Sequence, residues 1–172
     1  PTLVYNRDTA KATDHVKNYG STMADSIESM AQKCDCIFLS LPTSKEVDDV
    51  CTTIIANMKE GTVIVDTTSG DPSETRLIAY KVAKAGGVYL DCPVSGGPKG
   101  AIAGTLTCMI GDDDDFADAE ICPLILKTFG GKVVLTGPVG SGMAVKAINN
   151  VMNSAHLLVA AEGLLALRNF GV

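Results

Sequence analysis

The chain has 172 residues, of which 46% are apolar and 20% charged, and its formal net charge at pH 7 is −6. This length favours one domain with a real hydrophobic core, and the apolar content excludes intrinsic disorder. The acidic balance argues against nucleic-acid binding, because phosphate backbones are bound by basic surfaces. The chain also lacks an unbroken apolar run of about 18 residues, which argues against a membrane-spanning helix.

The cysteines lie mostly in apolar stretches, and none belongs to a Cys-x-x-Cys pair. We therefore expect buried free thiols in a reducing compartment, the cytoplasm or the mitochondrial matrix, rather than disulfides or zinc ligands. An extended chain would place two of them, at positions 34 and 36, on one side, which leaves a redox pair as the alternative there. The six are Cys34, Cys36, Cys51, Cys92, Cys108 and Cys122.

Short apolar segments alternate with longer helical patterns along the chain. In order, we expect strands at 3–5, 36–41, 62–66, 88–91, 105–110 and 132–135, and helices at 8–18, 21–30, 45–58, 72–85 and 116–129. Strands that alternate with helices of about 10–15 residues indicate βαβ units. The pattern therefore predicts an α/β fold with a mostly parallel sheet.

The pattern changes over residues 143–170, which contain no proline and a single glycine, Gly163. A helix of about 28 residues would be roughly 42 Å long. Its apolar residues occur nearly all round, and such a helix must be buried on every face. We therefore expect it to need a partner, either a second domain or a second subunit.

Polar or small residues follow three of the expected strands. Asn6 and Arg7 come directly after the first, and a guanidinium suits a ribose 2′-phosphate; the alternative is an ordinary polar turn. Residues 39–43 and 66–72 end the next two, and each alone fits simple helix capping. Ligands bind at the carboxyl ends of strands in doubly wound sheets, so three such ends along one edge favour a binding site.

Two glycine-rich segments lie later in the chain. Ser95, Gly96 and Gly97 would expose backbone N–H groups in a nest that can hold a carboxylate. Residues 137–142 then precede Lys146 and Asn150, which are neighbours on one helix face because they are four apart. A lysine on a mostly apolar helix either extends its ammonium to solvent or has a lowered pKa suited to acid–base chemistry.

The motifs Asp-x-Pro-Val-Ser-Gly-Gly at 91–97 and Gly-x-x-Gly-x-Gly-x-x-x-Lys-x-x-x-Asn at 137–150 resemble those of the β-hydroxyacid dehydrogenase family. That family includes 3-hydroxyisobutyrate dehydrogenase and the glyoxylate and succinic semialdehyde reductases, with 6-phosphogluconate dehydrogenase a more distant relative. The resemblance implies a Rossmann-like fold and hydride transfer between NADP(H), with NAD as the alternative, and a small 3-hydroxy acid or semialdehyde. The substrate would be a small carboxylic acid.

The resemblance also assigns roles to residues of this sequence. Lys146 would be the general acid/base, with Asn150 hydrogen-bonding the substrate beside it. Substrate would be held by Ser95, Gly96 and Gly97. The cofactor would be contacted by Asn6, Arg7, Leu41, Pro42, Glu46 and Ser69.

The chain departs from the family pattern at both ends. The family's first strand and its Gly-x-Gly-x-x-Gly turn are absent, and that strand would be central, so we expect a gap in the sheet. Residues 1–142 would be an incomplete NAD(P)-binding domain, and 143–172 a long helix leading to an absent all-α domain. We expect a homo-oligomer formed through both. The alternative is a catalytically silent module that keeps the fold for binding or dimer assembly.

The acidic run at residues 112–115 has two interpretations. Acids ahead of a helix complement its dipole, which is the favoured one. A cation site is the alternative, but a hard cation needs ligands that converge from several directions. We therefore predict no metal site.

Overall fold

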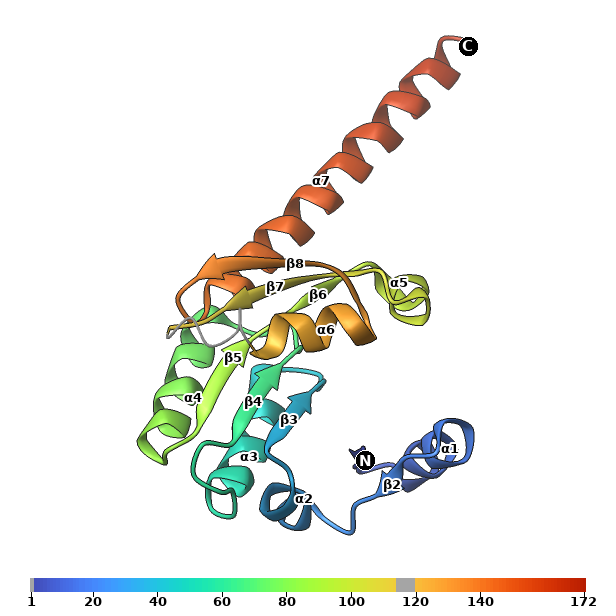
Figure 1. Cartoon of the computed structure of the whole chain (residues 1–172). Helices are drawn as coiled ribbons and strands as arrows, with labels where there is room; N and C mark the ends of the chain where they lie inside the picture. The colour runs from blue at the N-terminus through green and yellow to red at the C-terminus, as the bar shows by residue number, and fades with distance from the viewer. Residues whose placement is uncertain (1, 114–119) are drawn as a thin grey trace.

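The computed structural model describes residues 2–113 and 120–172. It confirms an α/β fold in which short strands alternate with helices (Figure 1). The strands are β1 (Leu3–Val4), β2 (Thr22–Met23), β3 (Cys36–Leu39), β4 (Val63–Asp66), β5 (Val88–Asp91), β6 (Val94–Ser95), β7 (Leu106–Gly111) and β8 (Gly130–Gly137). The helices are α1 (Thr9–Tyr19), α2 (Ile27–Lys33), α3 (Ser44–Ile55), α4 (Pro72–Lys84), α5 (Gly97–Ala103), α6 (Cys122–Thr128) and α7 (Ser141–Asn169).

The main sheet is mostly parallel, as the sequence predicts. β3, β4 and β5 pair in parallel, β5 and β6 pair antiparallel with β7, and β8 runs parallel to β7. The register places Leu39 opposite Asp66 and Asp66 opposite Asp91. The last residues of three consecutive strands therefore form one row, and the loops that follow them start at the same edge.

The first two strands form a separate parallel sheet, beside which α1 lies (Figure 1). Within the described residues, neither β1 nor β2 pairs with a strand of the main sheet. The carbonyls of Thr2 and Val4 accept N–H groups from β2 and from the residue after it. The backbone N–H and C=O groups of the residue between them therefore point to the other edge of β1, away from β2. This break lies where the expected gap in the sheet falls.

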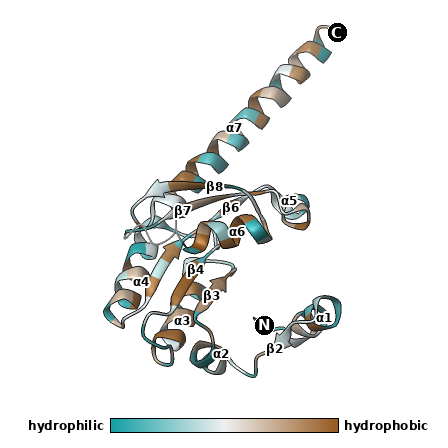
Figure 2. Ribbon diagram, in the orientation of Figure 1, coloured by the Kyte–Doolittle hydropathy of each residue, from teal (hydrophilic) through white to brown (hydrophobic). Residues whose placement is uncertain are grey.

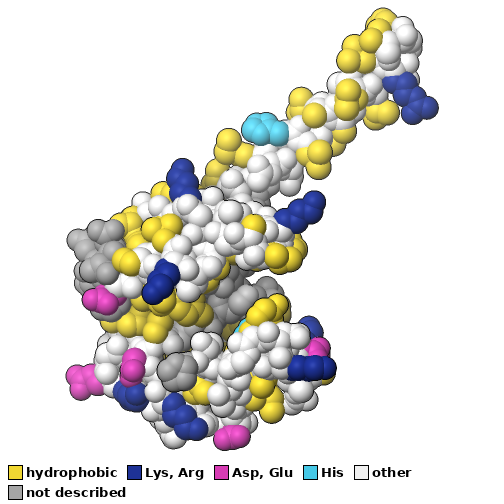
Figure 3. All heavy atoms as spheres, turned by 45° about the vertical axis from the view of Figure 1, so that its right-hand side comes forward, with side chains coloured by type: hydrophobic (Ala, Val, Ile, Leu, Met, Phe, Trp, Pro, Cys, Tyr) yellow, Lys and Arg dark blue, Asp and Glu magenta, His cyan; other side chains and the backbone are white. Residues whose placement is uncertain are grey.

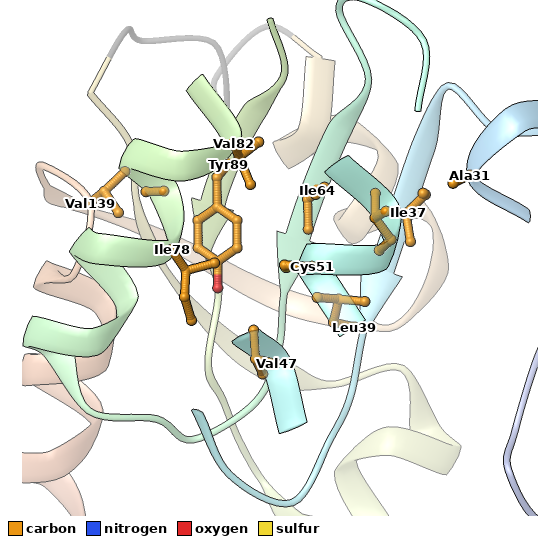
Figure 4. Close-up of a cluster of buried hydrophobic side chains, with 12 residues drawn as sticks. Ala31, Ile37, Leu39, Val47, Cys51, Ile64, Ile78, Val82, Tyr89 and Val139 are labelled. Atoms are coloured by element: carbon orange, nitrogen blue, oxygen red, sulfur yellow. The ribbon is translucent and has the colours of Figure 1, made fainter. Parts of the chain in front are cut away.

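Two clusters of apolar side chains cover the two faces of the main sheet. Ile64 of β4 packs with residues of α3 and α4 in one cluster, while its neighbours Val63 and Val65 belong to the other, which includes Ile125 of α6. This alternation follows from the period of two in a strand. Figure 4 shows the first cluster, in which the Tyr89 ring lies among aliphatic side chains. Of the cysteines, four are buried, and Cys34 and Cys36 are half-buried.

The structure differs from the expected elements at one place and adds to them at others. Residues 22–23 form β2 rather than a helix, and α2 starts only after Ser26, whose Oγ accepts the Ser29 N–H at 3.1 Å. The segment after Pro93, to which the sequence analysis assigned no helix or strand, forms β6 and α5. The helix expected at 116–129 is described only as α6, because residues 114–119, Phe116 among them, lie outside the described residues.

The helix α7 has 29 residues and projects from the body of the molecule (Figures 1 and 2). Its buried residues are Gly142 and Met143, both in the first turn. Apolar side chains beyond that turn remain exposed, such as Leu157 at 73% and Leu164 at 69% (Figure 3). The helix thus presents the unpartnered apolar surface that its sequence predicts.

Contrary to the sequence expectation, α7 is long and apolar enough to cross a membrane by length and composition alone. Its most apolar 18-residue window has a mean hydropathy of 1.2, and none of that window is buried. Lys146, Asn149 and Asn150 lie on the same helix, and polar groups of this kind are costly in a bilayer. A single helix of this kind also occurs as a core helix of soluble proteins.

Candidate functional site

The loops after β3 and β4 are joined by hydrogen bonds. The Leu41 N–H donates to Thr68 Oγ1 at 3.1 Å, and Thr67 Oγ1 donates to the Leu39 carbonyl at 2.6 Å. The Asp71 N–H donates to Ser44 Oγ at 2.8 Å, which ties the second loop to the start of α3. Two of the three strand ends expected to share an edge therefore form one connected surface.

Three of the expected cofactor contacts lie on this surface. Leu41 is half-buried, and Pro42 and Ser69 are exposed. The first turn of α3 is closed by a capping box, in which Thr43 Oγ1 accepts the Lys45 N–H and donates to the Glu46 carboxylate. Glu46 is thus occupied within its own helix, and the Thr43 hydrogen bond is the largest cause that lowers its pKa.

Asn6 and Arg7 lie in the turn after β1. Asn6 Oδ1 accepts the Asp8 N–H at 2.9 Å, so this side chain closes the turn that leads into α1. Arg7 is exposed and forms no ion pair within 4.0 Å among the described residues. Its charge contributes, as the smallest of several causes, to the lowered pKa of Glu46. Arg7 therefore lies within electrostatic range of α3, although β1 and β3 belong to different sheets.

This edge fits part of a dinucleotide. An exposed guanidinium without an ion-pair partner suits a phosphate, and Pro42 and Ser69 are exposed on the loops after β3 and β4. The cradle for a pyrophosphate is a glycine-rich turn at a helix start. In the part of the chain that the structure describes, the turn after β1 contains no glycine before α1 begins at Thr9. The turn after β1 thus suits the adenosine phosphate end of a dinucleotide and does not itself form a pyrophosphate cradle.

The segment that resembles a substrate-binding motif forms a tight turn between β6 and α5. Ser95 is half-buried and pairs with Thr107 of β7. Gly96 and Gly97 have φ values of 134° and 63°, which L side chains rarely adopt. A Cβ on Gly96 would lie 2.9 Å from Leu106, whereas one on Gly97 would meet nothing within 4 Å. Gly97 therefore faces open space, as the proposed nest requires.

Lys146 lies in the second turn of α7 and is half-buried. Burial lowers the pKa of its ammonium, the direction that suits proton transfer. Asn150 lies one turn further along and is exposed. Ser95 lies on β6, whereas Lys146 and Asn150 lie on α7, and among the described residues no hydrogen bond joins either of them to Ser95.

Sequence reasoning did not single out Asn149, which lies beside Asn150 on α7. Its side-chain Nδ2 is buried and has no hydrogen-bond partner within the described residues. A buried amide without a partner costs about 1–3 kcal/mol, which a bound group could recover. The signal available in the sequence was its position beside Asn150, in a helix otherwise rich in apolar residues.

Two buried carboxylates at the ends of β4 and β5, Asp66 and Asp91, accept hydrogen bonds that the sequence analysis did not predict. Asp66 accepts the Tyr89 hydroxyl at 2.7 Å and the Thr68 N–H at 3.0 Å. Asp91 bonds to the start of α7, as described below. Burial is the largest cause that raises the pKa of both groups. These two residues shape the loops that carry the candidate site rather than forming its surface.

One residue of the acidic run has a partner outside the helix that was expected to follow the run. Asp113 Oδ1 accepts the Val139 N–H at 3.0 Å and so holds the turn before α7 rather than a following helix. Asp114 and Asp115 lie outside the described residues. Within the described residues, no group of three or more His, Cys, Asp or Glu side chains could hold a metal ion.

Comparison with known proteins shows where this architecture recurs. Residues 1–137 match the NAD-binding domain of 6-phosphogluconate dehydrogenase. The mitochondrial 3-hydroxyisobutyrate dehydrogenase of Mus musculus is 35% identical over 152 residues, covering 86% of this chain and 44% of that protein. The 2-(hydroxymethyl)glutarate dehydrogenase of Eubacterium barkeri is 38% identical over 149 residues, covering 85% and 49%.

A solved structure agrees with these relatives. The 3-hydroxyisobutyrate dehydrogenase of Mycobacterium tuberculosis with L-serine superposes with a TM-score of 0.89 at 27% identity, covering 95% of this chain and 56% of that chain. The chain thus spans about half the length of the relatives it matches.

The hydrogen bond between the two strand-end loops can be tested by replacing Thr68 with valine. Thr68→Val removes the acceptor of the Leu41 N–H while keeping the side-chain shape, and Thr68 is only 3% exposed. We expect the free energy of unfolding, measured by urea denaturation, to fall by about 1–3 kcal/mol. Thr52→Val, on the exposed face of α3, is the matched control and should change stability by less than about 0.5 kcal/mol. Equal effects of the two substitutions would mean that this bond does not hold the loops together.

Proposed function

Because the chain belongs to the family of the NAD-binding domain of 6-phosphogluconate dehydrogenase, we propose that it is an oxidoreductase of the 3-hydroxyacid dehydrogenase or semialdehyde reductase kind. The reaction is hydride transfer between NADP(H) and a small 3-hydroxy acid or semialdehyde. The observation that carries this proposal is Lys146 on α7, which is half-buried and whose pKa is lowered by that burial. The relatives are dehydrogenases of hydroxy acids, which supports the same class.

The proposed domain organisation follows from the separate sheets. Residues 1–142 are an NAD(P)-binding domain in which a further strand would lie between β1 and β3. The carbonyls of Asp35 and Leu39 accept N–H groups from β4 and the loop after it, so Cys36 and Phe38 direct their backbone groups to the other edge of β3. Phe38 is 39% exposed there, which is unusual for the centre of a doubly wound sheet.

The second proposed part is residues 143–172, which lead to an all-α domain. The exposed apolar surface of α7 supports this proposal, because a helix of this kind needs cover. The same surface supports a homo-oligomer that forms through α7 and the helical domain. Six free thiols, four of them buried, favour a reducing compartment, either the cytoplasm or the mitochondrial matrix.

In the proposed reaction a bound nicotinamide supplies or accepts the hydride. When a semialdehyde is reduced, the Lys146 ammonium donates a proton to the carbonyl oxygen as that oxygen gains charge. In the reverse direction, the neutral amine takes the proton of the substrate hydroxyl. Asn150 hydrogen-bonds the same end of the substrate, and Ser95 with the backbone of Gly96 and Gly97 holds its carboxylate.

The cofactor preference that we propose is NADP, with NAD as the alternative. Arg7 supports this preference, since its guanidinium is exposed at the edge and has no ion-pair partner within 4.0 Å among the described residues. Asn6 would assist at the same ribose, and the backbone of Leu41 and Pro42 with Ser69 and Glu46 would line the remaining contact. A 2′-phosphate carries two negative charges that an uncompensated arginine stabilises.

The proton-transfer role predicts a direction for the pH dependence. Reduction needs the Lys146 ammonium, so its kcat falls as pH rises through the pKa of that group, while oxidation needs the amine and its kcat rises. Because burial lowers the pKa of Lys146, both the fall of kcat for reduction and its rise for oxidation should occur below the ordinary lysine pKa near 10.4. We expect Lys146→Met to lower kcat about 10²–10⁴-fold and to remove the pH dependence of kcat in both directions. Lys132→Met, at an exposed residue of β8, is the control. An unchanged kcat in Lys146→Met would refute the proposed proton-transfer role of Lys146.

The cofactor proposal predicts that Arg7→Ala weakens NADPH binding about 10–100-fold, because a charge-assisted contact contributes roughly 1.5–3 kcal/mol. NADH binding, which lacks the phosphate, should change less than about twofold. Fluorescence titration of the full-length protein measures the affinity for NADPH and for NADH, and Lys17→Ala on α1 is the charge-matched control. Equal losses for NADH and NADPH would remove the phosphate role, and binding of neither nucleotide by the unmodified protein would favour the silent module.

A further inference from the structure

The carboxylate of Asp91 joins the end of β5 to the start of α7. Asp91 is fully buried, and its Oδ1 accepts the Gly140 N–H at 2.7 Å while Oδ2 accepts the Met143 N–H at 2.8 Å. The N-cap position of α7 is Gly140, which has no side chain to accept the free amides of the first turn. Asp91 therefore supplies, from another element, the cap that the sequence of α7 lacks.

Two glycines leave the space that this carboxylate occupies. A Cβ on Gly111 of β7 would lie 2.2 Å from Asp91 Oδ1. A Cβ on Gly142 of α7 would lie 2.8 Å from Asp91 Oδ2 and 2.3 Å from the Met109 carbonyl. β5, β7 and α7 thus meet around one carboxylate with no room for an additional methyl group, so its position is fixed by packing as well as by hydrogen bonds.

The same carboxylate lies at the junction of the two halves of the candidate site. Ser95 follows Asp91 by four residues along the chain, through the buried Cys92 and Pro93. Lys146 follows Met143 by three residues, which is about 4.5 Å of helix rise. Met143 is held at a second point, because its sulfur accepts the Gly70 N–H at 3.3 Å. One buried group therefore relates the segment proposed to hold substrate to the helix that carries Lys146.

We infer that Asp91 is a positioning residue that sets the place of Lys146 relative to the substrate-holding turn, an inference that rests on the proposed function. Two hydrogen bonds to amides three residues apart prevent the first turn of α7 from sliding or rotating. Proton transfer requires donor and acceptor within about 2.6–3.2 Å. A displacement of about 1 Å at such a site can cost on the order of 100-fold in rate.

A double-mutant cycle separates positioning from a purely structural role. Asp91→Asn keeps one acceptor oxygen and presents an amide N–H to the other helix amide, so α7 should shift. With 3-hydroxyisobutyrate and NADP⁺, and the protein as its gene encodes it, we expect kcat to fall at least about tenfold. In the Lys146→Met background the same substitution should change kcat less than about twofold, because the group that it positions is absent.

The matched control is Asp66→Asn, which alters the other buried carboxylate of the same row, whose partners are Thr68 and Tyr89 rather than α7. Its effect on kcat should be the same with and without Lys146. If Asp91→Asn does not fold, Asp91→Ser, which leaves a smaller side chain with one hydroxyl acceptor, enters the same cycle. Equal losses in both backgrounds would overturn the positioning inference. Wild-type kcat in Lys146→Met alone would instead overturn the proposed function.

Discussion

The parallel register of β3, β4 and β5 is the constraint on which the candidate site depends. Leu39, Asp66 and Asp91 lie in one row across the sheet, so the loops after these strands all start at one edge. Hydrogen bonds between the loops then keep the first two together, and Asp91 ties the third to α7. A shift of one residue in either pairing would move the loops apart and turn each strand's side chains to the opposite face.

Burial of charge is the cost of this arrangement. Asp66 and Asp91 are neighbours in the row, both nearly inaccessible, and each has a raised pKa because burial disfavours its charged form. A raised folded-state pKa of a carboxyl group means that its contribution favours folding at acid pH and is lost as pH rises through that pKa. Hydrogen bonds offset part of the penalty: Asp66 accepts a backbone N–H and the Tyr89 hydroxyl, and Asp91 accepts two backbone N–H groups. The fold therefore keeps two buried carboxylates, each with its own set of hydrogen-bond donors.

The sequence predicted most of the secondary structure because the pattern was local. The apolar runs around Ile37 and Ile64, and Pro72 at a helix start, depend on short-range rules that hold regardless of context. The errors came where tertiary contacts decide. Thr22 joins a strand because β1 lies beside it, and Asp113 caps a turn 26 residues away. The motif residues around Ser95 and Lys146 were recognisable, whereas the role of Asp91 depends on contacts with two glycines that no local pattern encodes.

Binding of a dinucleotide at the strand ends of this chain is tested most directly by hydrogen–deuterium exchange with and without NADPH. In the full-length protein, we expect NADPH to slow exchange in peptides that cover residues 5–8, 40–46 and 67–71. Peptides that cover Leu77 to Lys81 of α4, away from the strand ends, should not change. Protection confined to those α4 peptides, or no protection at any strand end in excess NADPH, would contradict dinucleotide binding at this edge.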